Sequence, residues 1–125
     1  MSQWTAEQLN DFSTADDMRV APFYADGKTS GTPTWIWSVV VKGALYVRAW
    51  NGQHSGWYQS AKSQKAGRIH LAGQNFAVTY LPITADDQLT AAINQAYEAK
   101  YAGSPYLPPM LETGPVSATV RLDLK

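Results

Sequence analysis

Two apolar strands joined by a tight turn constrain the fold of this chain more than any other feature. Residues 35–41 (WIWSVVV) are aromatic or β-branched at almost every position, and residues 45–50 (LYVRAW) follow across Lys42-Gly43. Such residues favour strands, and the two-residue connection predicts a hairpin. The first strand is apolar on both faces. We therefore expect both faces to be covered, as in a small closed or nearly closed barrel rather than in an open sheet.

The length and composition of the chain limit the fold to one domain. With 125 residues, of which 45% are hydrophobic, residues 1–125 fit a single compact domain. Ten basic and ten acidic residues cancel, so we expect no nucleic-acid partner and no membrane-surface partner. The chain contains no cysteine, no apolar run of about 18 residues and no apolar signal segment, and we expect a cytoplasmic protein.

The first residues predict a helix and then a strand. Thr5 is expected to be the N-cap of a helix that ends near Asp16, with Gln8 completing a capping box. Residues 18–25 form an apolar strand candidate, and Asp26-Gly27 is expected to reverse the chain after it.

A second hairpin is predicted in the middle of the chain. A two-residue turn at Gly73-Gln74 would pair Leu71 with Phe76. The same register would pair Ile69 with Val78, so that all four side chains share one apolar face.

A long helix and a proline-rich segment precede the last strand. The helix is predicted to open at residues 84–87 and to stop at Gly103 and Pro105. Residues 103–115 contain four prolines and predict a stiff extended crossing, either a lid or a strap. Residues 118–124 alternate as in a strand. The predicted fold is mainly β (α+β): a split barrel of about six antiparallel strands, with a short helix after strand 3 and a longer helix in the C-terminal half.

The segment AWNGQHSGWYQSAK contains the residues best suited to bind an anion. Ser55 is a credible N-cap, and the N–H groups of Gly56 and Trp57 would then be free to bind a phosphate. Arg48 could add a bidentate contact and Lys62 a point charge. The alternative is that Ser55 only caps the helix, that Trp57 packs one turn on, and that Arg48 faces water.

The order of the motifs resembles that of the flavin and deazaflavin split-barrel superfamily. A loop, GKTSGTP, precedes a strand; GALYVRAW and SGWYQSA follow, and a hairpin begins at GRIHLAGQNFAV. The deazaflavin-dependent nitroreductase branch has the same succession of parts. From Trp4 to Lys125 the chain resembles more closely an uncharacterised bacterial family, the domain of unknown function numbered twenty-two fifty-five.

The superfamily resemblance implies a flavin site along the strand that follows the loop. Residues 34–38 would edge the ring, and Arg48, Trp50 and the loop through Ser55 and Trp57 would hold the phosphate. The cofactor-binding residues that we expect are Lys28, Ser30, Trp35, Trp37, Ser38, Arg48, Trp50, Asn51, His54, Ser55, Gly56, Trp57 and Lys62. The residues expected at the substrate or in a lid are Tyr58, Tyr106 and Met110.

The sequence leaves two functions open and assigns no catalytic residue. The first is an FMN- or deazaflavin-dependent oxidoreductase, nitroreductase-like, in which the cofactor supplies the redox chemistry for a small organic substrate. The second is a cofactor-free barrel that binds a small ligand or a protein, which the bulk of Trp35 and Trp37 favours. His54 and His70 are the only histidines, and we expect no metal. The resemblance also implies a homodimer.

Overall fold

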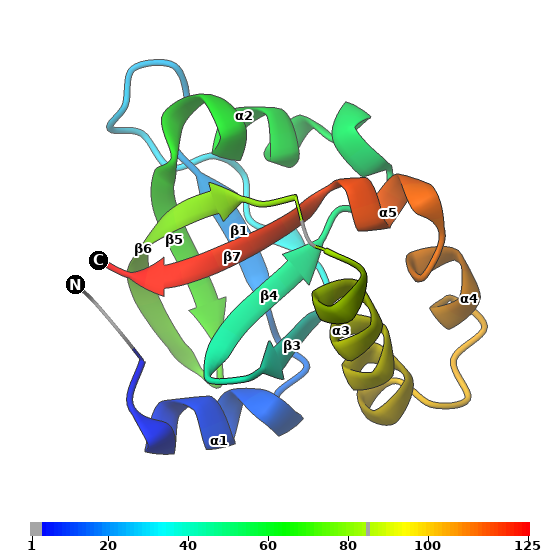
Figure 1. The fold of residues 1–125 in the computed structure, drawn as a ribbon. Coiled ribbons are helices and arrows are strands. Elements are labelled where there is room, and N and C mark those ends of the chain that lie inside the picture. Colours follow the sequence, from blue (N-terminus) through cyan, green and yellow to red (C-terminus); the bar gives the residue numbers. More distant parts are fainter. Residues whose placement is uncertain (1–3, 85) are drawn as a thin grey trace.

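A computed structural model describes residues 4–84 and 86–125 as a curled antiparallel sheet with helices packed around it (Figure 1). In chain order the elements are α1 (Ala6–Thr14), β1 (Arg19–Pro22), β2 (Thr34–Trp35), β3 (Ser38–Val41), β4 (Ala44–Arg48), the 3-10 helix η1 (Gly52–His54), α2 (Gly56–Gln64), β5 (Ala66–Leu71), β6 (Gln74–Pro82), α3 (Asp87–Lys100), α4 (Leu107–Met110), α5 (Thr113–Ser117) and β7 (Thr119–Leu124). Within the described ranges, every helix is too short or too polar to span a bilayer.

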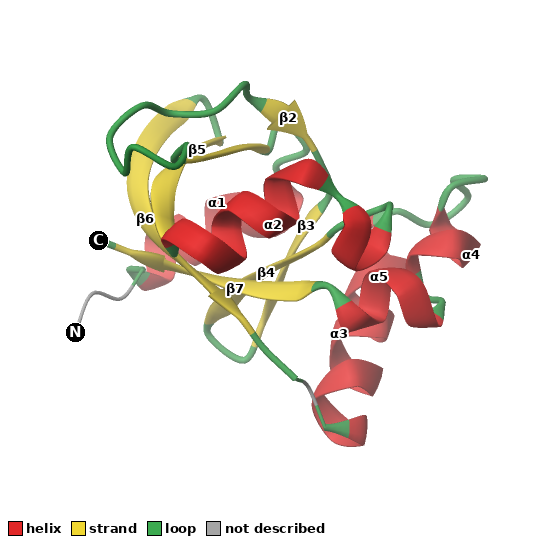
Figure 2. Ribbon diagram, turned by 90° about the horizontal axis from the view of Figure 1, so that it is seen from above, coloured by secondary structure: helices red, strands yellow, loops and turns green. Residues whose placement is uncertain are grey.

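The two edges of the sheet are strands that are neighbours in sequence. The strand order is β2-β1-β5-β6-β7-β4-β3, and all pairings are antiparallel. Only Ile36 and Trp37, which we call the seam, separate β2 from β3 along the chain. The sheet therefore curls until its edges approach each other, which gives the half-barrel of Figures 1 and 2. The strand predicted over residues 35–41 is split at the seam, so the sheet has seven strands rather than about six.

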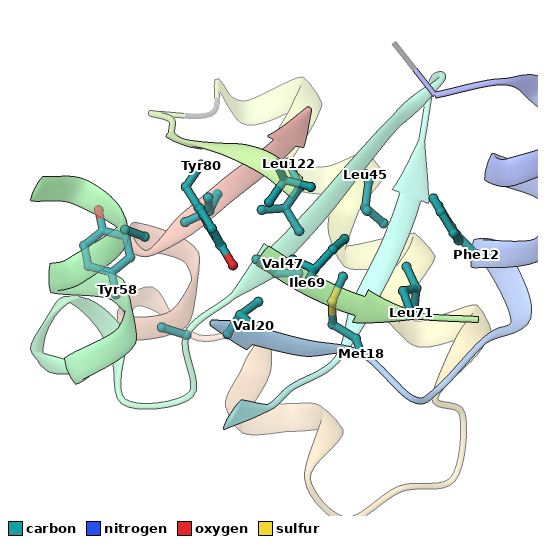
Figure 3. Packing of buried hydrophobic residues seen from close by; sticks show 14 of the residues in the cluster. Phe12, Met18, Val20, Leu45, Val47, Tyr58, Ile69, Leu71, Tyr80 and Leu122 are labelled. Atoms are coloured by element: carbon teal, nitrogen blue, oxygen red, sulfur yellow. The ribbon is translucent and has the colours of Figure 1, made fainter. Parts of the chain in front are cut away.

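One apolar cluster fills the interior of the half-barrel (Figure 3). Its side chains come from α1, α2 and the strands β1, β4, β5, β6 and β7. The largest fully buried members are Phe12, Met18, Leu45, Ile69, Leu71, Tyr80 and Leu122. The Tyr80 hydroxyl donates to the carbonyl of Arg68 at 2.6 Å and accepts the N–H of Ala21 at 3.2 Å, so this buried polar group is satisfied.

A second apolar cluster lies on the outer face of β3 and β4, where α3 covers the sheet (Figure 1). Alternation along β4 supplies both clusters, because Leu45 and Val47 belong to the interior and Tyr46 to the outer layer. Ile93 and Tyr97 of α3 are fully buried in the outer layer. The predicted hairpin and the predicted cover on both of its faces are confirmed.

The hairpin of β5 and β6 forms, but in a register that differs from the predicted one. Its turn residues are Ala72-Gly73, with positive φ values of 52° and 73°, and Leu71 lies opposite Gln74. Ile69 lies opposite Phe76, so both predicted pairings are wrong. The shift amounts to two residues and keeps every side chain on its predicted face.

A distant carboxylate accounts for this turn. Asp17 accepts the N–H groups of Ala72 and Gly73 at 2.7 and 2.8 Å. These hydrogen bonds hold Ala72 in a left-handed conformation that alanine seldom adopts on its own. Asp17 is 55 residues from Ala72 along the chain, so local turn preferences do not reveal the contact.

Two of the predicted helix starts are capped, the first by the predicted capping box. Thr5 accepts the N–H of Gln8 at 3.0 Å, and the Gln8 side chain accepts the N–H of Thr5 at 2.8 Å, which confirms the capping box. Asp86 caps α3 by accepting the N–H of Leu89 at 2.7 Å. Ala85, which the prediction placed in the same helix start, lies outside the described residues.

The proline-rich segment is helical rather than extended, so the predicted stiff crossing is wrong. It contains α4 and α5. Pro108 and Pro109 lie in the first turn of α4, and Pro115 lies in the first turn of α5. Helix N–H groups have no intrahelical partner in a first turn, so proline is tolerated there. The segment thereby folds back against the outer layer of the half-barrel.

Candidate functional site

A cavity of about 500 Å³ opens beside the seam. Three parts of the chain that are far apart in sequence meet there: the seam with the end of β2, the end of β4, and the connection that runs from α3 through α4. The residues that line the cavity are Trp35, Ile36, Trp37, Arg48, Trp50, Ser104, Tyr106 and Met110. We call this space the seam cavity.

The architecture of the sheet explains why the cavity forms at this place. β2 hydrogen-bonds to β1 and β3 to β4, so the chain leaves one edge of the sheet at Trp35 and joins the other edge at Ser38. The seam belongs to neither edge. Two hydrogen bonds hold its backbone: the N–H of Ile36 donates to the carbonyl of Met18 at 3.1 Å, and the hydroxyl of Tyr97 donates to the carbonyl of Trp37 at 3.3 Å.

Arg48 is the charged residue of the seam cavity. It follows Tyr46 on the outer face of β4, beneath α3 and α4, and its side chain is 0% exposed. Nη1 donates to Oδ1 of Asn94 at 2.6 Å and to the carbonyl of Met110 at 3.2 Å. The guanidinium carbon lies 5.2 Å from the centre of the Tyr97 ring. The alternative that Arg48 faces water is therefore wrong, because α3 covers this face of the strand.

The rest of the Arg48 guanidinium is buried without a partner. Nε and Nη2 make no hydrogen bond to any residue in the ranges 4–84 and 86–125, and no carboxylate of these ranges forms a salt bridge with Arg48. Burial lowers the pKa of Arg48 from its ordinary value, and the contact with Tyr97 acts in the opposite direction. Arginine still keeps its charge at neutral pH, so the cavity contains an uncompensated positive charge.

Large aromatic side chains form the rim of the seam cavity. Trp35 is 63% exposed, Trp50 46% and Tyr106 61%, which is unusual for side chains of this size. Trp50 and Tyr106 meet edge to face with ring centres 5.8 Å apart. The indole of Trp35 donates to the carbonyl of Asp16 at 2.9 Å.

The aromatic wall is rigid on the side of the seam. Trp37 stacks on Tyr101 of the segment after α3, with ring centres 4.0 Å apart and an angle of 4° between the planes. Tyr101 is fixed in turn, because its hydroxyl accepts the N–H of Ser38 at 3.1 Å and lies 3.2 Å from the Ser38 carbonyl. A flat ligand would therefore meet a preformed aromatic surface.

Six of the predicted site residues meet at this cavity. They are Trp35, Trp37, Arg48, Trp50, Tyr106 and Met110. Ile36, which lies within the residues 34–38 expected to edge a ring, also lines the cavity, as does Ser104, which the sequence analysis missed. The sequence analysis also missed Asn94 and Tyr97, which contact Arg48 from α3. The helical spacing of Asn94, Tyr97 and Tyr101 places them on one face of the predicted helix, and this pattern could have indicated Asn94 and Tyr97 as contact residues.

The start of α2, predicted to bind a phosphate together with Arg48, lines a different depression. Ser55 occupies the N-cap position, but its side chain makes no capping hydrogen bond. Gly56 and Trp57 line a space of about 280 Å³ together with residues of β1 and the loop after it. Arg48 is absent from that lining, so the structure does not bring the two predicted phosphate donors into one cavity.

The remaining predicted residues of this segment are placed around α2. Gly52 has φ +64° and allows the chain to bend sharply after Asn51. His54 ends the short helix η1, and Asn51, His54 and Lys62 are exposed. Tyr58 is buried in the interior cluster and does not contact the seam cavity.

The predicted loop residues lie away from the seam cavity. Lys28 is exposed, and its N–H donates to the side chain of Asp26 at 2.9 Å within the turn. Ser30 forms an isolated antiparallel bridge with Phe23. Neither residue is among those that line the cavity.

Ser38, also predicted at the cofactor, is buried and links β3 to α3 by a hydrogen bond. Its carbonyl accepts Lys100 Nζ at 2.8 Å, and Nζ also donates to the carbonyl of Phe12 at 3.1 Å. Burial lowers the pKa of Lys100 to about 8. The Ser38 hydroxyl lies 3.5 Å from Nζ, but neither residue lines the seam cavity, so this serine and lysine join three elements and do not present a nucleophile to the cavity.

The chain belongs to the family described as "Uncharacterized protein conserved in bacteria (DUF2255)", whose family model matches residues 8–122. The family predicted from the sequence is therefore confirmed. No curated protein and no solved structure matches the chain.

Proposed function

We propose that this member of the DUF2255 family binds a small organic ligand with a flat apolar body and one anionic group in the seam cavity. The observation that carries the proposal is Arg48: a fully buried guanidinium, two of whose three nitrogens have no hydrogen-bond partner in the described ranges, in a cavity with aromatic walls. A protein that needed only a packed core would place an apolar side chain there.

The energetics favour an anion as the missing partner. An uncompensated buried charge costs several kcal/mol. A ligand carboxylate or phosphate at Nε and Nη2 would recover about 1.5–3 kcal/mol through charge-assisted hydrogen bonds in a site with little water. The cavity volume of about 500 Å³ lies within the range that small-molecule sites usually have.

The aromatic rim supplies the apolar part of the binding energy. Trp35, Trp50 and Tyr106 are 46% to 63% exposed, and a flat ligand that covered them would remove a large apolar surface from water. Arg48 would orient the ligand by its charged end. Small-molecule sites typically combine apolar walls with a few polar groups that orient the ligand.

A second candidate is the flavin- or deazaflavin-dependent oxidoreductase of the split-barrel type. The presence of Trp35, Trp37 and Arg48 in one cavity favours it, since these residues would flank the ring and hold the phosphate. The bound flavin would supply the redox chemistry. The lining of the cavity includes one of the two phosphate donors that the sequence predicted, so the first candidate is the better supported.

The proposal is tested by calorimetric titration of the protein with a panel of flat ligands: FMN, riboflavin, 2-naphthoate and the neutral 2-naphthol. We expect at least one anionic ligand to bind, and Arg48→Ala to weaken that ligand about 10- to 150-fold, as the loss of a charged hydrogen-bond pair implies. Arg121→Ala is the matched control, because Arg121 lies on β7 and pairs with Asp123 at 3.1 Å. Arg48-independent binding, or no binding by any member of the panel, would contradict the proposal. Tight binding of FMN with a visible spectral shift would favour the second candidate.

A further inference from the structure

We infer that the anionic group recognised by Arg48 is a carboxylate of a planar aryl or heteroaryl acid rather than a phosphate, and that Asn94 and the carbonyl of Met110 fix the guanidinium for this purpose. The inference rests on the proposed function and specifies the class of ligand that the seam cavity binds.

One edge of the Arg48 guanidinium is left for a ligand. Nη1 is occupied, since it donates to Asn94 at 2.6 Å and to Met110 at 3.2 Å. The partnerless atoms Nε and Nη2 form the opposite edge of Arg48. This edge presents two parallel N–H groups, and the two oxygens of a carboxylate match it in a bidentate pair.

The charge of the seam cavity matches a monoanion better than a dianion. Arg48 is the only Lys or Arg among the residues that line the seam cavity. A phosphate monoester carries about −1.5 to −2 charges at neutral pH, so one guanidinium would leave part of that charge buried without compensation. A carboxylate carries one charge, and the pair with Arg48 is neutral.

The nearby cations do not change this count. Lys100 is held by the carbonyls of Phe12 and Ser38 and lines a separate space of about 470 Å³ together with residues of α1 and β3. The free N–H groups at Gly56 line the depression beside α2. Neither group is among those that line the seam cavity, so the described lining holds no second cationic group for a dianion.

The walls of the seam cavity suit a ligand with a flat aromatic body. The aromatic wall at Trp37 is fixed by its stacking on Tyr101, and Trp50 and Tyr106 stand edge to face at the rim. Flat aromatic rings gain from offset stacking and edge contacts with such a wall. An aryl acid therefore satisfies both the wall and the charge with one rigid molecule.

Asn94 and Met110 are positioning residues in this arrangement. They come from α3 and α4, and together with the Tyr97 ring at 5.2 Å they hold the plane of the guanidinium from two sides. Asn94 supplies a neutral acceptor, so it orients Arg48 without cancelling its charge. An aspartate at position 94 would cancel that charge.

The experiment compares 2-naphthoate, 2-naphthyl phosphate and 2-naphthol by calorimetric titration at pH 7.5. We expect 2-naphthoate to bind at least about 10-fold more tightly than either of the others. Arg48→Lys should weaken 2-naphthoate about 10-fold or more, because a lysine is a point charge without the bidentate edge. Asn94→Asp should weaken 2-naphthoate by a similar factor and leave 2-naphthol unchanged, a pattern that loss of folding would not produce. Arg121→Lys is the control and should leave all three affinities unchanged.

The outcomes separate the inference from the proposed function. If 2-naphthyl phosphate binds as tightly as 2-naphthoate or more tightly, the carboxylate assignment is overturned and the proposed anion site stands. If 2-naphthol binds as tightly as 2-naphthoate, or Asn94→Asp leaves the affinity for 2-naphthoate unchanged, charge recognition by Arg48 is overturned. If none of the three probes binds, the proposed function fails together with the inference.

Discussion

Replacing Arg48 by methionine should stabilise the fold while removing the group that binds the ligand. The side chain is 0% exposed, and its charge has no carboxylate partner in the described ranges. The charge is retained for binding, according to our proposal, and its burial weakens the folded state.

The magnitude follows from three contributions. Removing an unpaired buried charge relieves several kcal/mol of desolvation. Against this, the acceptors on Asn94 and Met110 lose hydrogen bonds from a charged donor, about 1.5–3 kcal/mol each. A methionine thioether beside the Tyr97 ring adds about 0.3–1.5 kcal/mol. Because Asn94 is only partly buried, its amide can turn to water, and we expect a net gain of about 1 kcal/mol.

The assay is urea unfolding of the wild type and of Arg48→Met, with Arg121→Met as the control. A gain of about 1 kcal/mol corresponds to a rise in Tm of about 3–4 °C for a chain of this size. Arg121 is partly exposed on β7, and its substitution should change the free energy of unfolding by no more than about 0.5 kcal/mol. A loss greater than about 1 kcal/mol for Arg48→Met, at an unchanged m value, would show that Arg48 is a structural residue and would refute the reasoning.

Three further predictions test residues that support the fold outside the seam cavity. Burial lowers the pKa of Lys100 to about 8, whereas an unfolded lysine keeps its proton to about pH 10.4; the unfolded state therefore binds more protons above pH 8. In urea unfolding, the free energy of unfolding of the wild type should rise from about pH 8 to about pH 9.5 relative to that of Lys100→Met. The control variant Lys62→Met, at an exposed lysine, should keep the pH dependence of the wild type. Equal pH profiles for the wild type and Lys100→Met would contradict the prediction. Gly67→Ala should lower the free energy of unfolding by at least about 2 kcal/mol, because the new Cβ would lie 2.6 Å from backbone atoms of β1. The control Gly56→Ala meets nothing within 4 Å and should be nearly neutral. Similar thermal midpoints for the two variants would refute the close packing of β5 against β1 at Gly67. Burial alone raises the pKa of Asp17, but hydrogen bonds from the β5–β6 turn lower this pKa overall from 3.8. The stabilisation by Asp17 is therefore present above pH 3.8 and is lost as the pH falls through the lower folded pKa. Asp17→Asn should make the free energy of unfolding depend less steeply on pH in this window, and an unchanged acid profile would count against the contact.

Local signals predicted the elements whose stability depends on nearby residues. The capping box at Thr5 and Gln8 and the cap at Asp86 follow from patterns within a few residues, and both are present. The hairpin across Lys42-Gly43 was also predicted, because its turn and its apolar strands are local features.

Long-range contacts decided the features that the sequence did not reveal. Alternation placed Arg48 on the face of Tyr46, but α3 buries that face through Asn94, which is 46 residues away. The register of the second hairpin depends in the same way on Asp17. The break in the strand at the seam follows from the pairing of β2 and β3 with different neighbours, which a continuous apolar run does not show.

The proline-rich segment shows a different limit. Four prolines predicted an extended chain, but three of them lie in first turns of α4 and α5, where the missing N–H costs nothing. The same difficulty affected the site prediction, because residue type alone did not reveal the conformation of this segment. Tyr106 and Met110 were expected at a substrate or a lid, yet only their place around α4 makes them wall residues of the seam cavity.

The Nε–H resonance of Arg48 in ¹H–¹⁵N spectra tests the central claim most directly. The chain has four arginines, and the Arg48 signal can be assigned by its absence in Arg48→Lys. On titration with 2-naphthoate, the account predicts a downfield shift of this one Nε–H proton, as a new charge-assisted hydrogen bond forms, while the other three signals stay in place. Saturating binding of 2-naphthoate with an unmoved Arg48 signal would contradict the account.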